Sequence, residues 1–139
     1  MSKTVTKSLG KSVKASLIGG LAGGIVFGIL MQMMGMISQI AGMMGSDSVV
    51  VGWGIHLMIS LIFGAGFGIF AVNTNKVYAF GLIYGIILWI VGPLIILPLM
   101  MGMGTMLAAA FAPAQLMSLM THLMFTLILS FVYKLTVKA

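Results

Sequence analysis

Four long apolar segments constrain this chain more than any other feature of its sequence. Each is close to the ~20 consecutive apolar residues that a helix needs to cross the core of a bilayer. The segments are continuous and lack the alternation of a membrane barrel, so they are predicted to be helices. They cover residues 14–37, 48–72, 77–103 and 115–133. The sequence therefore predicts an all-α integral membrane protein, a four-helix bundle that forms a single transmembrane domain over residues 1–139.

Charged residues are scarce and almost all positive. Residues of hydrophobic type make up 61% of the chain and charged residues 6%, and the net charge is +6. The lysines lie near predicted helix ends, where anionic lipid headgroups explain them better than nucleic acid does. The single carboxylate and the lack of cysteine speak against hydrolase chemistry and thiolate metal sites. The composition does not favour an enzyme.

The lysines predict the orientation in the membrane. They precede the first span, separate the second from the third, or follow the fourth. These residues are Lys3, Lys7, Lys11, Lys14, Lys76, Lys134 and Lys138. Asp47 is the one charge on the opposite side. Because cytoplasmic loops are enriched in lysine, both termini are predicted to be cytoplasmic.

The two histidines lie in matching sequence. "HLMISLI" begins at His56 and "HLMFTLI" begins at His122. The first and third spans also share a pattern, "SLIGG" from Ser16 and "GLIYG" from Gly81. Two copies of one hairpin are therefore predicted, at about residues 14–72 and 77–134. Both copies have the same orientation, with a symmetry axis along the membrane normal.

Small residues recur every four positions and so share a helix face. Small side chains let helices approach closely in lipid, so these faces are expected to pack and to bring the second and fourth spans together. The predicted packing positions are Gly20, Gly24, Gly28 and Gly64. Polar residues on these faces are candidate hydrogen-bond partners of the histidines, namely Gln32, Ser60 and Thr126.

The chain has fourteen methionines besides Met1. All fourteen lie in the outer halves of the predicted spans or in the outer loops, on the side of the membrane opposite the lysines. Methionine suits irregular packing or a partner surface, but with histidine it also suits Cu(I). His56 and His122 are therefore either a structural pair, ligands of copper or haem b, or part of a proton or substrate path. For a metal, the candidate ligands are His56, His122, Met33, Met58 and Met124.

Three motifs carry a resemblance to a known family. They are "GWGIHLM" from Gly52, "LPLMMGMG" from Leu97 and "THLMFTLILSFVY" from Thr121. Together they resemble a family of small, uncharacterised prokaryotic four-span membrane proteins with Trp-x-x-His in the second span and His in the fourth. The resemblance implies a multi-pass protein of the prokaryotic cytoplasmic membrane with histidines as a family feature. It implies no activity.

The functional hypothesis ranked first is an accessory or assembly subunit of a larger membrane complex. Small size, minimal loops and the methionine-rich half favour it. The expected partners are the lipid bilayer and either another membrane protein or further copies of this chain. The alternative is a copper-handling or haem b-binding membrane protein that uses His56 and His122.

Overall fold

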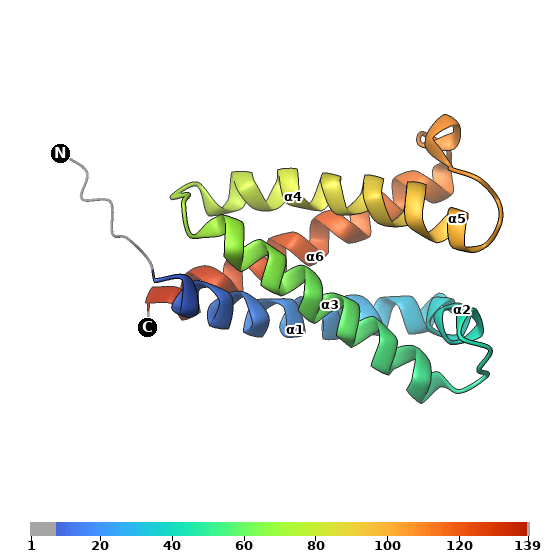
Figure 1. Ribbon diagram of the computed structural model, residues 1–139, viewed down its shortest axis with the longest axis horizontal. Helices are drawn as coiled ribbons and strands as arrows, with labels where there is room; N and C mark the ends of the chain where they lie inside the picture. Colours follow the sequence, from blue (N-terminus) through green and yellow to red (C-terminus); the bar gives the residue numbers. More distant parts are fainter. Residues whose placement is uncertain (1–7, 139) are drawn as a thin grey trace.

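Four long helices form an elongated bundle. The computed structural model describes residues 8–138, so Lys3 and Lys7 lie outside the described residues. The long helices are α1 (Leu9–Met33), α3 (Val49–Ala71), the α4–η1–α5 run (Val77–Met100) and α6 (Pro113–Lys138). Each is long and apolar enough to cross a membrane, and they pack side by side (Figure 1). The predicted all-α class and the four apolar spans are confirmed.

Helix α1 begins at Leu9, before the predicted start of the first span. Ser8 caps it, because its Oγ accepts the N–H of Lys11 at 3.2 Å. Ser12 is fully buried within this extension, as is Ser16 one turn further on. The small-residue face of α1 therefore extends beyond the predicted start of the span. The lysines in this turn, Lys11 and Lys14, are exposed, so they do not interrupt that face.

The connection predicted at residues 38–47 is partly helical. Gly35 has a φ of 74°, a left-handed conformation that favours glycine, and it precedes a short helix, α2 (Met36–Met43). Ile37 and Ala41, one turn apart, are buried where α2 packs against α3. One apolar stripe is thus enough to hold this two-turn helix on the bundle.

The third span widens at its first proline. The sequence predicts a kink here, because proline lacks an N–H and cannot complete the helical ladder. Helix α4 (Val77–Val91) passes into a π-helical turn, η1 (Gly92–Ile96), with Pro93 in its first turn. The N–H of Leu97 then reaches back five residues to the carbonyl of Gly92. The interruption is a wide turn that keeps the helix continuous.

The second proline frees a carbonyl that the next segment uses. Pro98 lies in the short helix α5 (Leu97–Met100) and cannot donate to the carbonyl of Leu94. That carbonyl accepts the N–H of Met106 instead, at 2.8 Å. This bond ties the segment before η2 (Leu107–Ala109) to the end of the third span.

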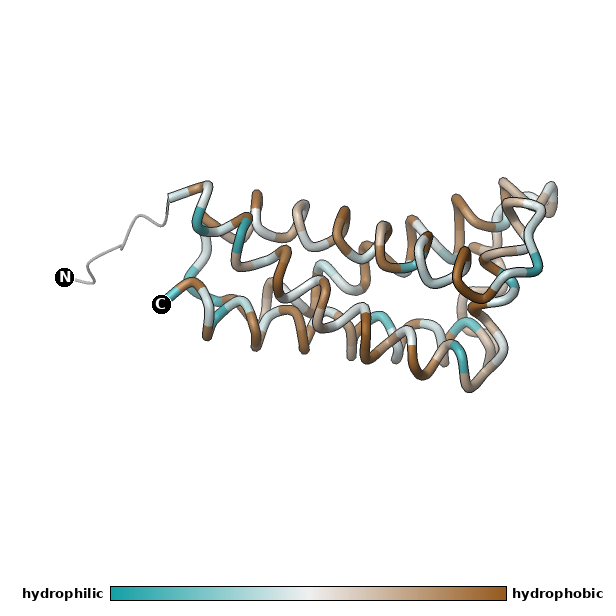
Figure 2. Tube along the Cα trace, turned by 90° about the horizontal axis from the view of Figure 1, so that it is seen from below, coloured by the Kyte–Doolittle hydropathy of each residue, from teal (hydrophilic) through white to brown (hydrophobic). Residues whose placement is uncertain are grey.

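The order of packing differs from the expected pairing of the second and fourth spans. Helix α1 packs against both α3 and α6, α4 packs against α6, and α3 has little contact with α4. Helices α3 and α6 meet through large side chains, such as Phe67 and Tyr133, whose ring centroids are 5.5 Å apart. Apolar residues run along the helices and hydrophilic residues concentrate toward the two ends (Figure 2).

The small-residue faces of α3 and α6 pack on α1 and α4, respectively. A methyl group at Gly20 would lie 2.7 Å from the carbonyl oxygen of Ser60. One at Gly85 of α4 would lie 2.5 Å from Oγ1 of Thr126 on α6. The predicted small faces are therefore interfaces, but they join each helix to its hairpin partner.

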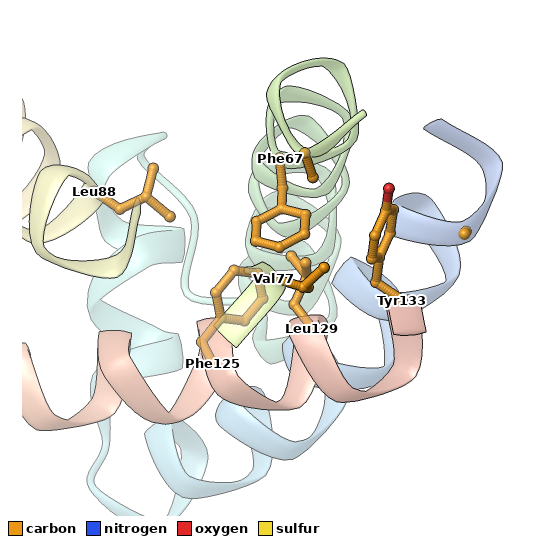
Figure 3. Packing of buried hydrophobic residues seen from close by; sticks show 8 residues of the cluster. Phe67, Val77, Leu88, Phe125, Leu129 and Tyr133 are labelled. Atoms are coloured by element: carbon orange, nitrogen blue, oxygen red, sulfur yellow. The ribbon is translucent and has the colours of Figure 1, made fainter. Parts of the chain in front are cut away.

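Aromatic and aliphatic side chains fill the core (Figure 3). The labelled residues are Phe67, Val77, Leu88, Phe125, Leu129 and Tyr133.

A buried chain of hydrogen bonds connects three helices next to this core. The hydroxyl of Ser12 donates to the carbonyl of Gly68 at 2.7 Å, and it lies 2.7 Å from the hydroxyl of Tyr133. Since Ser12 has one hydroxyl hydrogen, Tyr133 is the donor in the second bond, and the chain links α6 to α1 to α3.

Candidate functional site

His56 lies on the face of α3 that packs against α1. Its side chain is 5% exposed, and its Nε2 is 2.8 Å from the carbonyl oxygen of Gly24 on α1. A carbonyl only accepts, so Nε2 carries the proton and donates. Small residues on this face of α1 let the two backbones approach closely, and a methyl group at Gly28 would lie 3.0 Å from Cδ2 of His56.

His122 makes a different kind of bond. It is partly buried on α6, and its Nδ1 donates to the carbonyl oxygen of Ser118, one turn earlier in the same helix, at 2.7 Å. Nδ1 therefore carries the proton, whereas in His56 it is Nε2. The two imidazoles thus hold opposite tautomers when neutral.

Phe27 of α1 contacts both histidines. Its ring centroid is 5.5 Å from that of His56 and 5.7 Å from that of His122, and both contacts are edge-on. The same ring lies 6.4 Å from Phe125 of α6. The structure therefore brings the two histidines to one shared neighbour, and that neighbour is apolar.

Phe27 is not among the residues that the sequence patterns indicate. The available signal was its position beside Gly24 and Gly28, on a turn of α1 where small residues otherwise dominate. A large ring in such a stretch lies at the edge of the packing face and can reach a third helix.

The candidate hydrogen-bond partners bind elsewhere. Gln32 accepts through Oε1 from the indole N–H of Trp53 on α3. Ser60 donates to the carbonyl of His56 at 2.9 Å, within its own helix. Thr126 donates to the carbonyl of Leu123 at 3.2 Å. Of these three hydrogen bonds, only that of Ser60 is to a histidine residue, and it is to the backbone.

The candidate thioether ligands are not enclosed with the imidazoles. The side chains of Met33 and Met58 are 79% and 55% exposed, and Met124 is partly buried. Within residues 8–138, no group of three or more His, Cys, Asp or Glu side chains is gathered as a metal site. In the same range, no buried side-chain nitrogen or oxygen lacks a hydrogen-bond partner.

The four predicted packing glycines all lie between α1 and α3. A methyl group at Gly24 would be 2.6 Å from Oγ of Ser60, and one at Gly28 would overlap the ring of Trp53. A methyl group at Gly64 would be 2.7 Å from the carbonyl oxygen of Ser16, and Gly20 faces Ser60 as described above. These glycines bring α1 close enough to α3 for His56 to bond to a helix carbonyl.

A second feature is an exposed surface of methionines at the end of the bundle that carries α2 and α5 (Figure 1). We call it the methionine surface. It consists of Met33, Met34, Met43, Met44, Met58, Met100, Met101, Met103, Met117 and Met120. A cavity of about 170 Å³ opens there, lined by Met34, Met36, Ala114, Met117, Ser118 and Thr121. It is a mainly apolar groove between the α1–α2 junction and the start of α6.

Comparison with known proteins found no matching family model, no significantly similar curated protein and no significantly similar solved structure. The resemblance to small four-span membrane proteins therefore stays a prediction. It depends on the motifs around Trp53, Pro98 and His122.

Proposed function

We propose that this protein is an accessory or assembly subunit of a larger membrane complex, and that the methionine surface contacts the partner. The observation that carries this proposal is the exposure of the methionines at one end of the bundle, with Met44 70% and Met120 65% exposed. Methionine is flexible and polarizable, so it adapts to a partner's surface and is favoured where packing is irregular.

Contact with lipid alone does not account for this surface. Within residues 8–138, the exposed side chains of the half of the bundle near the lysines include Ile83, Phe131 and Leu135 and no methionine. Contact with lipid tails does not favour methionine over leucine or isoleucine, because all three side chains are apolar. A protein partner at the methionine-rich end would account for the difference.

In this proposal the histidines have a structural role. Each imidazole donates its N–H to a backbone carbonyl, and both rings pack on Phe27. A polar group in a membrane interior is costly unless it is bonded, and here the bonds are supplied by the helices themselves.

We further propose two same-orientation hairpins with cytoplasmic termini. Support comes from the matching contacts of Gly20 with Ser60 and of Gly85 with Thr126, which join α1 to α3 and α4 to α6. The ends of α1 and α6 that carry lysines lie at one end of the bundle, together with the α3–α4 turn (Figure 1). Asp47 follows α2 at the other end.

Site-specific photo-crosslinking in native membranes tests the subunit proposal. A photoreactive side chain at Met101 or Met120 (59% and 65% exposed) is compared with one at Ile83 or Leu135 (58% and 60% exposed). We expect a discrete adduct with a second, different polypeptide only from the methionine positions. Lipid adducts alone at all four positions would contradict the proposal, as would adducts with further copies of this chain only.

The alternative function is binding of copper or haem b by His56 and His122. One observation favours it: each N–H is oriented by a carbonyl, an arrangement also seen in metal-binding histidines, and each neutral ring keeps one nitrogen lone pair. Against it, the neighbour shared by the two rings, Phe27, cannot bind a metal, and Met33 and Met58 are exposed.

Metal analysis of protein purified from its own membranes, with a visible spectrum, decides between the two roles. The structural role predicts no stoichiometric metal and no haem band. A six-coordinate low-spin haem spectrum, or one copper per chain, that is lost in both His56→Ala and His122→Ala would establish the alternative instead.

A further inference from the structure

A cavity at the lysine-rich end has the chemistry of an anion site. Its volume is about 250 Å³, and it lies between the α3–α4 turn and the last turns of α6. Its lining consists of Asn75, Val77, Lys134, Val137 and Lys138. Two lysines and an asparagine thus share the lining with two apolar residues.

No carboxylate side chain neutralises these lysines. Asp47 is the only acidic residue of the chain, and it lies in the connection between α2 and α3, at the opposite end of the bundle. Lys134 is partly buried, and its Nζ lies 4.9 Å from the centre of the Tyr78 ring on α4. This cation–π contact holds the charge of Lys134 between α6 and α4.

The start of α4 adds to the positive potential. Val77 is its first residue, and the N-cap residue, Lys76, makes no side-chain capping bond. Unpaired N–H groups at a helix start favour an anion. Since Val77 also lines the cavity, this partial charge acts in the same place as the two lysines.

Apolar side chains continue from the cavity along the bundle. Tyr78 and Leu82 lie one turn apart on α4 and are 40% and 41% exposed. Phe131 and Leu127, one and two turns from Lys134 on α6, are 53% and 39% exposed. A ligand with a negative head and an apolar tail would match both the cavity and these faces.

We propose that this cavity binds the phosphate of an anionic phospholipid from the leaflet at the lysine-rich end. Lys134 and Lys138 pair with the phosphate, Asn75 donates to its oxygens or to the headgroup, and the acyl chains lie along exposed side chains of α4 and α6. Basic pockets between membrane helices are suited to such headgroups.

Native mass spectrometry of the full chain in detergent tests the site. The protein is titrated with phosphatidylglycerol or with zwitterionic phosphatidylcholine. We expect preferential retention of phosphatidylglycerol, and we expect it to be on the order of tenfold weaker in the Lys134→Gln/Lys138→Gln variant. The Lys134→Arg/Lys138→Arg variant keeps both charges and should retain the lipid.

The matched control is Lys11→Gln/Lys14→Gln. It removes the same charge from the same end, but from exposed residues of α1 that do not line the cavity. Equal weakening in both double Gln variants would show that only general surface charge matters and would overturn the proposal. Equal retention of the two lipids would overturn it as well. If an equal concentration of inorganic phosphate displaced phosphatidylglycerol, the cavity would be a site for a free anion. That result would overturn the proposal that the bound phosphate belongs to a lipid.

Discussion

The imidazole of His56 donates a hydrogen bond to the backbone carbonyl of Gly24, 2.8 Å away on a neighbouring helix. Glycines of α1 let the two helices approach closely enough for this bond, and a methyl group at Gly28 would lie 3.0 Å from Cδ2 of His56. His122 has no comparable bond to a second helix, since its Nδ1 bonds to Ser118 of its own helix. The seven-residue segments that begin at the two histidines share five residues, but the two side chains have different structural roles.

The first prediction follows from this difference. His56→Ala removes a bond between α1 and α3 and leaves a cavity at a side chain that is 5% exposed, so it should lower the free energy of unfolding by about 1–3 kcal/mol. His122→Ala removes a bond within one helix and should cost less than about 1 kcal/mol. Equilibrium unfolding in detergent, followed by circular dichroism, measures both. Equal losses would contradict the assigned roles.

The second prediction compares two glycines of α3. A methyl group at Gly64 would lie 2.7 Å from the carbonyl oxygen of Ser16, whereas Gly54 has nothing within 4 Å. Gly64→Ala should therefore destabilise the bundle by about 1–3 kcal/mol through overpacking. Gly54→Ala should leave stability unchanged or raise it by up to about 1 kcal/mol, because alanine favours helix. The sign of the difference in melting temperature is the readout, and a tolerated Gly64→Ala would rule out close contact there.

The third prediction concerns the chain of hydrogen bonds from Tyr133 through Ser12 to Gly68. Tyr133→Phe keeps the ring in the core and removes the hydroxyl that donates to Ser12, 2.7 Å away. We expect a loss of about 0.5–1.5 kcal/mol, in the range of a buried hydrogen bond. Tyr78→Phe serves as the control, because that ring is 40% exposed, and it should be neutral in the same unfolding assay. A neutral Tyr133→Phe would mean that the three-helix bond chain contributes no stability.

The fourth prediction tests the proposed orientation. The chain has no cysteine, so a single introduced cysteine reports its own location. Asp47→Cys should react with a membrane-impermeant maleimide in intact cells, and Asn75→Cys should react only after permeabilisation. The reverse pattern would invert the topology, and equal labelling of both positions in intact cells would exclude it.

The sequence by itself determined the class of this fold. Apolar length is a local property, so the four spans could be recognised without knowing what they contact. The same holds for the small faces of the first and second spans, because residues four apart share a helix face wherever the helix packs. Gly20, Gly24, Gly28 and Gly64 are all buried for this reason.

The helical form of the connections was less predictable. Helix α2 depends on Ile37 and Ala41 finding a surface on α3, and the freed carbonyl of Leu94 depends on Met106 returning to it. Both involve contacts between segments that are separate in the sequence. Local patterns could mark the prolines as an interruption, but they could not indicate that a π-helical turn would keep the span continuous.

Only the tertiary structure decided the partners of the polar side chains. The sequence made Gln32 a candidate hydrogen-bond partner of the histidines, but Gln32 accepts from Trp53, and His56 bonds to Gly24. "HLMISLI" and "HLMFTLI" share five of seven residues, yet His56 bonds to the backbone of another helix and His122 bonds to its own helix. The physical reason is that a side chain's partner depends on which helix lies opposite, and that choice is made by the packing of all four helices together.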